Sequence, residues 1–373
     1  MPQIIRRPLT LTAPGQQLEL TQFVYNQGGS PVVYLQAGIH ADEYPAMAAL
    51  EQLRAQLDGL EDQLVGEVRL VPIANPGGLT QFFQTHHQGR YEMDSGENFN
   101  RAYPDLLNAL VRQLEPKLGG SMAQNDALIR AAIREQAKNF KPVSLNQEHK
   151  ATLFEWACDA DYVLDVHCDD VAELHLYASR RAQKDLMPLA QALKATVVML
   201  ADDSGGSSFD EAAPGLWAAL AERFPDYPIG MGCRGCTVEL RGQADVSQQL
   251  AEQDAQGMLA YLRQIGVLAG QAEIPPHQPH LCDLESVDLV PAPVAGLVEW
   301  AVPLGSQVEP GQVIARIMKL GGQGAPDTHA VTARNKGRLF TRVHRPYVRA
   351  GQTLAKIAGD EPLKWRSGYL LGD

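Results

Sequence analysis

This sequence lacks three features: a membrane-spanning segment, a signal peptide and a basic cluster that could bind nucleic acid. No uninterrupted apolar run approaches the roughly 20 residues that cross a bilayer. Residues 1–8 lack the apolar core of a signal peptide. Lysine and arginine occur in short pairs rather than clusters, and the net charge is −12. We therefore expect no membrane partner and no nucleic-acid partner, because phosphate backbones attract clustered cations.

Cysteine is scarce, and its pattern excludes a disulfide framework. The chain holds five cysteines, an odd number scattered over its length: Cys158, Cys168, Cys233, Cys236 and Cys282. Cys233 and Cys236 form one C-x-x-C pair, but the sequence shows neither a second pair nor a thioredoxin-like context, which argues against a redox or metal role; the role of the pair stays open. Free thiols indicate a reducing compartment, and we expect a cytoplasmic protein.

The length and one change of composition predict two domains. At 373 residues, with 45% apolar and 20% charged residues, the chain can bury large cores. A proline-rich linker at residues 274–279 separates two different patterns. We expect the first domain over residues 1–272 and a β-rich second domain over residues 284–373.

The first domain shows the order strand, helix, strand, which predicts an α/β sheet. An apolar, β-favouring run at residues 32–35 is followed by helical spacing that begins near Pro45. Further predicted elements are strands at 66–74, 160–166, 197–200 and 236–240, helices within 104–147, and a helix at 246–265.

The second domain contains an internal repeat. Residues 308–317 match residues 348–357, and each half predicts strand, turn and strand. This pattern resembles the small all-β hammerhead barrel of biotinyl and lipoyl domains. Lys319, which follows Met318, raises the alternative of a carrier lysine, although the context of a carrier motif is absent.

Candidate metal ligands and a candidate base follow or end several strands of the first domain. His40 and Glu43 come after the first core strand, and His167 ends another. Sites form beyond the carboxyl ends of strands in open α/β sheets. Two imidazoles and one carboxylate suit Zn²⁺ and leave one position for water. Glu239, in a further strand, suits the role of general base.

These residues, in this order with Asn75-Pro76-Gly77 and Asn98-Phe99-Asn100-Arg101, resemble the succinylglutamate desuccinylase/aspartoacylase family of the zinc carboxypeptidase superfamily. The resemblance covers roughly residues 30–270 and implies a mixed, doubly wound sheet followed by a small β domain.

The resemblance also implies roles for individual residues. His40, Glu43 and His167 would hold one Zn²⁺ per chain, and Glu239 would be the catalytic base and acid. Asn100 and Arg101 would bind the α-carboxylate of the substrate, since the arginine fork matches a carboxylate. Arg90 would polarise the scissile carbonyl, although the length of its loop differs from the family pattern. Asp165 and Asp169 either orient a ligand imidazole or are solvated carboxylates.

The preferred hypothesis is a zinc-dependent deacylase acting on the amide of an N-acyl amino acid or a related small metabolite. A metallocarboxypeptidase acting on short peptides is the first alternative, since the same residues would serve it. A binding or carrier protein that uses Lys319 is the second. The sequence leaves the acyl group and the oligomeric state open, and a homo-oligomer is one of the possibilities.

Overall fold

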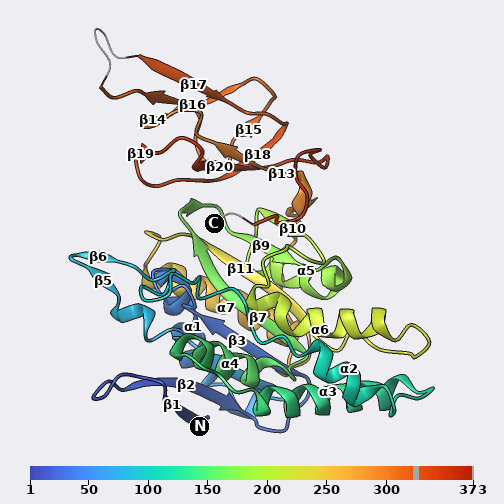
Figure 1. Ribbon diagram of the computed structural model, residues 1–373. Coiled ribbons are helices and arrows are strands. Elements are labelled where there is room, and N and C mark those ends of the chain that lie inside the picture. Colours follow the sequence, from blue (N-terminus) through green and yellow to red (C-terminus); the bar gives the residue numbers. More distant parts are fainter. Residues whose placement is uncertain (322–326, 372–373) are drawn as a thin grey trace.

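The computed structural model describes residues 1–321 and 327–371. A large mixed sheet lies between two layers of helices, and a smaller all-β module stands at one end of it (Figure 1). The predicted mixed α/β fold is confirmed.

Nine strands form the large sheet. Their spatial order is β1 (Gln3–Leu9), β2 (Leu18–Tyr25), β4 (Glu67–Val71), β3 (Val32–Ala37), β7 (Tyr162–Asp169), β11 (Arg234–Gly242), β9 (His175–Ala178), β10 (Val197–Leu200) and β12 (His280–Asp283). The central strands β4, β3, β7 and β11 run parallel, whereas β9 runs antiparallel to β11. Strand β11 therefore has one parallel and one antiparallel neighbour.

Helices cover both faces of this sheet. One apolar core contains residues from α1 (Tyr44–Leu57), α5 (Gln183–Ala192) and α7 (Gln248–Gln264). The other contains residues from α2 (Leu107–Leu114), α3 (Met122–Asn139), α4 (Leu145–Ala157) and α6 (Phe209–Arg223). Within residues 1–321 and 327–371, no helix has both the length and the apolar character needed to cross a membrane.

Most predicted elements of the first domain are present, and the differences lie in short segments. Helix α1 carries Pro45 in its first turn, as the sequence predicts. Strand β7 continues to Asp169, so His167 lies inside the strand rather than at its end. Strands β9 and β12 were not predicted because their four residues are of mixed polarity, whereas the equally short β10 is wholly apolar and was predicted. The loop at 80–98 contains a small hairpin, β5 (Phe82–Phe83) and β6 (His86–His87).

The C-terminal module consists of two antiparallel sheets with an apolar core between them. The first sheet contains β13 (Val287–Pro291), β20 (Thr353–Ala358), β18 (Gly337–Arg342) and β15 (Gln307–Val308). The second contains β17 (Thr328–Thr332), β16 (Val313–Met318), β14 (Gly296–Trp300) and β19 (Tyr347–Val348).

The two halves of the repeat exchange strands. Strand β15 of the first half pairs with β18 of the second, and β19 of the second half pairs with β14 of the first. Gly311 and Gly351, at equivalent positions, turn the chain with φ of 84° and 85°. Each half thus completes the sheet of the other, while the closed hammerhead barrel stays a prediction.

Strand β3 offers a test of how the sheet stabilises the fold. Leu35 is fully buried between β4 and β7, so Leu35→Ala should lower the free energy of unfolding by about 2–5 kcal/mol. Urea titration followed by circular dichroism measures the loss. Leu297→Ala, at a position that is 37% exposed, is the control and should cost much less. Equal losses in the two variants would contradict this account.

Candidate active site

The loop between β3 and α1 brings His40 and Glu43 together. Gly38 turns the chain with φ of +72°, and a Cβ atom there would lie 2.7 Å from the sulfur of Met47. The side chain of Asn75 donates to the carbonyl of Ile39 at 2.9 Å. These two contacts hold the loop from both sides.

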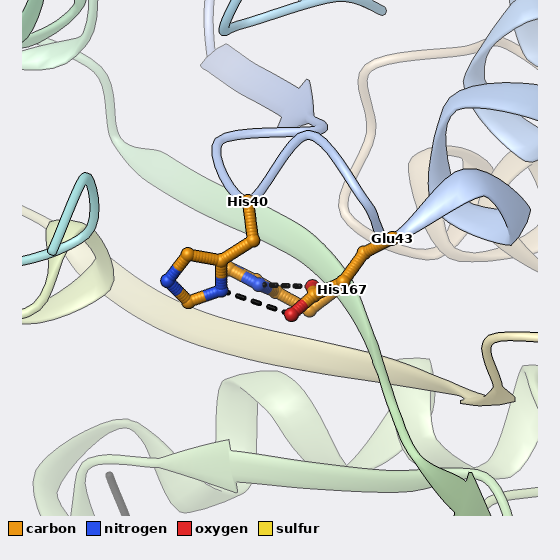
Figure 2. A group of neighbouring side chains, drawn as sticks. All are labelled: His40, Glu43 and His167. Atoms are coloured by element: carbon orange, nitrogen blue, oxygen red, sulfur yellow. Dashed lines mark hydrogen bonds and ion pairs between the residues drawn. The ribbon is translucent and has the colours of Figure 1, made fainter. Parts of the chain in front are cut away.

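His40, Glu43 and His167 form one buried cluster (Figure 2). The Nδ1 atom of His40 lies 2.9 Å from Oε1 of Glu43, and Nδ1 of His167 lies 2.7 Å from Oε2. One candidate ligand atom from each residue falls within 4.8 Å of the others. The predicted set is thus brought together from the loop and from β7.

The hydrogen bonds on the far side of each ring show what the cluster can hold. Nε2 of His40 lies 2.9 Å from Oδ1 of Asn98, and Nε2 of His167 lies 2.8 Å from Oδ2 of Asp165. In the tautomer with the proton on Nε2, the Nδ1 lone pair of each ring faces an oxygen of Glu43. Two imidazole nitrogens beside one carboxylate form a donor set that suits Zn²⁺.

Burial and neighbouring charges shift the pKa values of all three residues of the cluster. Burial alone would raise the pKa of Glu43, but His167 and His40 lower it well below its usual range. Burial also opposes the shift at His167, where the carboxylates of Asp165 and Glu43 raise the pKa well above its ordinary value. Burial and the Arg90 guanidinium lower the pKa of His40 to about 4.

Glu239 lies beside the cluster and carries an unused oxygen. In the sheet its register partners are His167 on β7 and His175 on β9, so the three side chains share one face. Its Oε2 atom is buried and has no hydrogen-bond partner among the described residues. Burial, followed by the charge of Glu43, raises the pKa of Glu239 to about 8. A carboxyl with a pKa near neutrality can both take up and release a proton.

Arg90 reaches the cluster through a close backbone contact. The carbonyl of Gly89 accepts a hydrogen bond from the amide of Ala41 at 2.9 Å. The Nη1 atom of Arg90 then lies 3.1 Å from Oε1 of Glu43 and 3.2 Å from Nδ1 of His40. The sequence named Arg90 only as the nearest candidate, and the structure places it against the predicted ligands.

Asn100 and Arg101 lie nearby but have different environments. The Nδ2 atom of Asn100 donates to Oδ2 of Asp165 at 3.2 Å, and its Oδ1 accepts from the amide of Phe209 at 2.9 Å. Arg101 is half-buried and donates to the carbonyl of Asn100 at 2.7 Å. Contact of either side chain with a substrate carboxylate stays a prediction.

A cavity of about 1080 Å³ joins these residues. It is lined by the cluster, Glu239, Arg90 and Arg101, and also by residues of the C-terminal module such as Arg342 and Lys356. Residues of both the large α/β part and the C-terminal module therefore line the site.

Sequence reasoning left some supporting residues open and missed others. Asp165 is fully buried and hydrogen-bonded to His167, which settles the open choice in favour of an orienting carboxylate. The spacing of Asp165 and His167 by two residues in a strand puts both on one face. Nothing in the sequence marked Asn98 as the partner of His40. Asp169 is paired with Lys356 rather than solvated, a contact that only the fold creates.

The geometry defines a class of protein: a mixed α/β fold with a buried site suited to one metal ion. Residues 30–265 match the family model described as succinylglutamate desuccinylase/aspartoacylase catalytic domain. This range is more than half of the chain, and the chain belongs to that family.

Individual relatives agree with this assignment. The N-alpha-acetyl-L-2,4-diaminobutyric acid deacetylase of Halomonas elongata is 25% identical over 343 residues, which cover 90% of this chain and 84% of the relative. A crystal structure of a family protein from Shewanella amazonensis is 27% identical, with a TM-score of 0.84, and covers 95% of this chain and 98% of that one. The ectoine utilization protein EutE (DoeB) from Ruegeria pomeroyi, solved with bound product, shares the fold: 20% identity, a TM-score of 0.63, and coverage of 92% and 90%.

The segment that carries Asn98 and Asn100 rests on a buried histidine. His149 of α4 is 3% exposed, its Nε2 contacts the carbonyl of Ala74, and its ring lies 6.0 Å from that of Phe99. Burial lowers the pKa of His149 to about 4, although the bond to Ala74 opposes the shift. The folded protein therefore keeps this imidazole neutral at pH values where the unfolded chain is protonated.

This difference predicts an acid-sensitive contribution to stability. Because the folded pKa lies below the unfolded value of about 6.5, His149 should stabilise the protein fully above that value and progressively less down to about pH 4. The stability gap between wild type and His149→Gln should shrink by about 1 kcal/mol between pH 7.5 and 5.5. Urea titrations at both pH values measure the gap, and a gap that does not change would contradict the assignment.

Proposed function

We propose that the protein is a zinc-dependent deacylase that hydrolyses the amide bond of an N-acyl amino acid or a related small metabolite. One observation carries the proposal. Candidate ligand atoms of His40, Glu43 and His167 lie within 4.8 Å of one another, and Oε2 of Glu239, without a hydrogen-bond partner among the described residues, lies on the adjacent strand. This is the arrangement that a hydrolase needs to hold a metal ion and to move a proton beside it.

Each side chain then has a defined task. A bound Zn²⁺ would supply Lewis-acid polarisation of the amide carbonyl and would acidify water. Glu239 takes the proton of the attacking water and passes it to the departing amine. The guanidinium of Arg90, next to Glu43, faces the negative charge that develops on the carbonyl oxygen. Asp165 and Asn98 keep both imidazoles in the tautomer that leaves Nδ1 free.

The cavity supports a small substrate with charges of both signs. Arg101 offers a fork for the α-carboxylate, and Asn100 would join it by exchanging its present partners. Acidic residues at the start of α6 and in the loop before it line the same cavity: Asp202, Asp203, Asp210 and Glu211. They favour a substrate with a second, protonated amine. The Halomonas relative is named for such a substrate, an N-acetylated diamino acid, and we extend this substrate class to the present chain.

The same proposal covers the organisation of the chain. Residues 1–272 would form the hydrolase domain and residues 284–373 the small barrel, in a cytoplasmic enzyme with one zinc ion per chain. Strand β12, at residues 280–283, adds to the large sheet and so lies at the junction of the two parts.

The metal assignment predicts a loss of zinc in ligand variants. Purified wild-type protein should contain about one zinc per chain, and Glu43→Ala or His167→Ala should contain close to none, because two protein ligands hold Zn²⁺ poorly. Inductively coupled plasma mass spectrometry of the dialysed proteins measures the zinc content per chain. His329→Ala, at an exposed position of β17, should keep the wild-type amount. Full zinc content in both ligand variants would refute the site.

The proton-transfer role predicts a separation of activity from metal binding. Glu239→Gln should lower kcat by about 10²–10⁴-fold and keep its zinc, since the variant loses only the acid and base. The assay follows release of free amine from Nα-acetyl-L-2,4-diaminobutyrate, N-acetyl-aspartate and N-succinyl-glutamate. Glu309→Gln, in an exposed turn of the C-terminal module, is the control. Full activity in Glu239→Gln would remove Glu239 from the mechanism.

Short peptides with a free C-terminus belong in the same assay. They separate the deacylase from the metallocarboxypeptidase, for which the same ligands and base would serve. Faster release of a C-terminal residue than of an acyl group would favour the carboxypeptidase and overturn the proposed substrate class.

A further inference from the structure

The C-terminal module attaches to the large sheet directly after the predicted ligand His167. Residues 171–172 form the short strand β8 (Val171–Ala172), which pairs antiparallel with β18 of the module. The amide of Glu173 donates to the carbonyl of Phe340 at 2.9 Å. The guanidinium of Arg338 donates two hydrogen bonds to the carboxylate of Glu173, at 2.6 and 2.7 Å. The module is thus anchored on the segment that leaves the site.

One cation of the module reaches further, into the cavity itself. The Nζ atom of Lys356 on β20 lies 2.5 Å from Oδ2 of Asp169 and 3.4 Å from the hydroxyl of Tyr177. The side chains of Lys356 and Asp169 are 18% and 19% exposed. All three residues line the cavity that contains the predicted catalytic groups.

The two partners of Lys356 lie on different strands of the large sheet. Asp169 ends β7 and Tyr177 lies in β9, and these are the two strands that flank β11. Lys356 therefore ties together both neighbours of the strand that carries Glu239. The bridge crosses β11 at the end where Glu239 and His167 lie side by side.

The backbone at this place leaves little room for independent movement. The amide of Gln243 donates to the carbonyls of Asp169 and Asp170, at 3.0 and 3.1 Å. A Cβ atom on Gly242 would lie 2.8 Å from the carbonyl oxygen of Asp170. A shift of the end of β7 would therefore displace β11 just beyond Glu239, since both chains are packed in contact.

The internal repeat shows that this contact is special to one half. Arg316 occupies the position of Lys356 in the first half of the repeat, and its side chain is exposed on β16. Two equivalent cations thus have opposite environments, and only the second one faces the site. An ordinary surface lysine of the module would resemble Arg316.

We propose that Lys356 is a positioning residue for the reaction, supplied by the C-terminal module. Its ammonium joins Asp169 to Tyr177 and so holds the strand ends that present His167 and Glu239. The module is then a working part of the site rather than an appended domain. The inference rests on the proposed function, because it names a residue that acts through the predicted ligands and base.

The test replaces the cation and compares the two halves of the repeat. Lys356→Met should lower kcat about 10–100-fold and change KM less than threefold, with zinc retained. Lys356→Arg should restore most of the activity, because it keeps a donor to Asp169. Arg316→Met is the matched control and should behave as wild type. Tyr177→Phe, which leaves no unpaired charge, should lower kcat by about fivefold or less.

A second readout does not depend on turnover. The visible absorption of a Co²⁺-substituted protein reports ligand geometry, and it should change in Lys356→Met but not in Arg316→Met. If wild type cleaves no substrate of the panel, the proposed function fails while this spectrum still decides the role of Lys356. A kcat within twofold of wild type, or an unchanged cobalt spectrum, would overturn the inference. A loss of kcat that Lys356→Arg does not restore and that follows the folded fraction in circular dichroism would also overturn it.

Discussion

The site depends on one constraint: a buried carboxylate, Glu43, lies between two imidazole nitrogens. A charged carboxylate is costly to bury without positive charge close to it. Arg90 supplies that charge at 3.1 Å, and the two histidines, whose far nitrogens are held by Asn98 and Asp165, lie against the two oxygens of the carboxylate. The same arrangement places candidate ligand atoms of His40, Glu43 and His167 within 4.8 Å of one another. The groups that surround the buried carboxylate therefore also form a set suited to a metal ion.

The order of strands in the mixed sheet determines the position of Glu239, the predicted base. Strand β11 has β7 on one side and β9 on the other, so Glu239 is placed between His167 and His175. Side chains at paired positions share a face, which brings the carboxylate next to a predicted ligand without giving it a hydrogen-bond partner. A buried acid with a free oxygen has no evident structural use, and this supports a chemical one.

The relatives narrow the chemistry without naming the substrate of this chain. Membership of the desuccinylase/aspartoacylase family agrees with deacylation of small N-acyl amino acids. The cavity of this chain has two differently charged parts. The acidic loop before α6 lines one part, whereas arginine and lysine side chains of the C-terminal module line another. A zwitterionic substrate would find complementary charge in both parts.

The sequence by itself was sufficient to predict the mixed α/β fold, the family and the repeat, and to name His40, Glu43, His167 and Glu239 as candidates, because apolar periodicity and ordered motifs are local properties of a chain. The roles of these four residues stay a prediction. Only the tertiary structure decided that Asn98 holds His40 and that Arg90 lies against Glu43, since these contacts join distant segments through loops. Strands β9 and β12 were also not predicted, because four residues of mixed polarity carry too little pattern. The repeat shows the limit most clearly. Its two halves are alike in sequence, yet Lys356 contacts Asp169 in the cavity whereas Arg316 is exposed, because the partners of a side chain are set by packing across the whole fold.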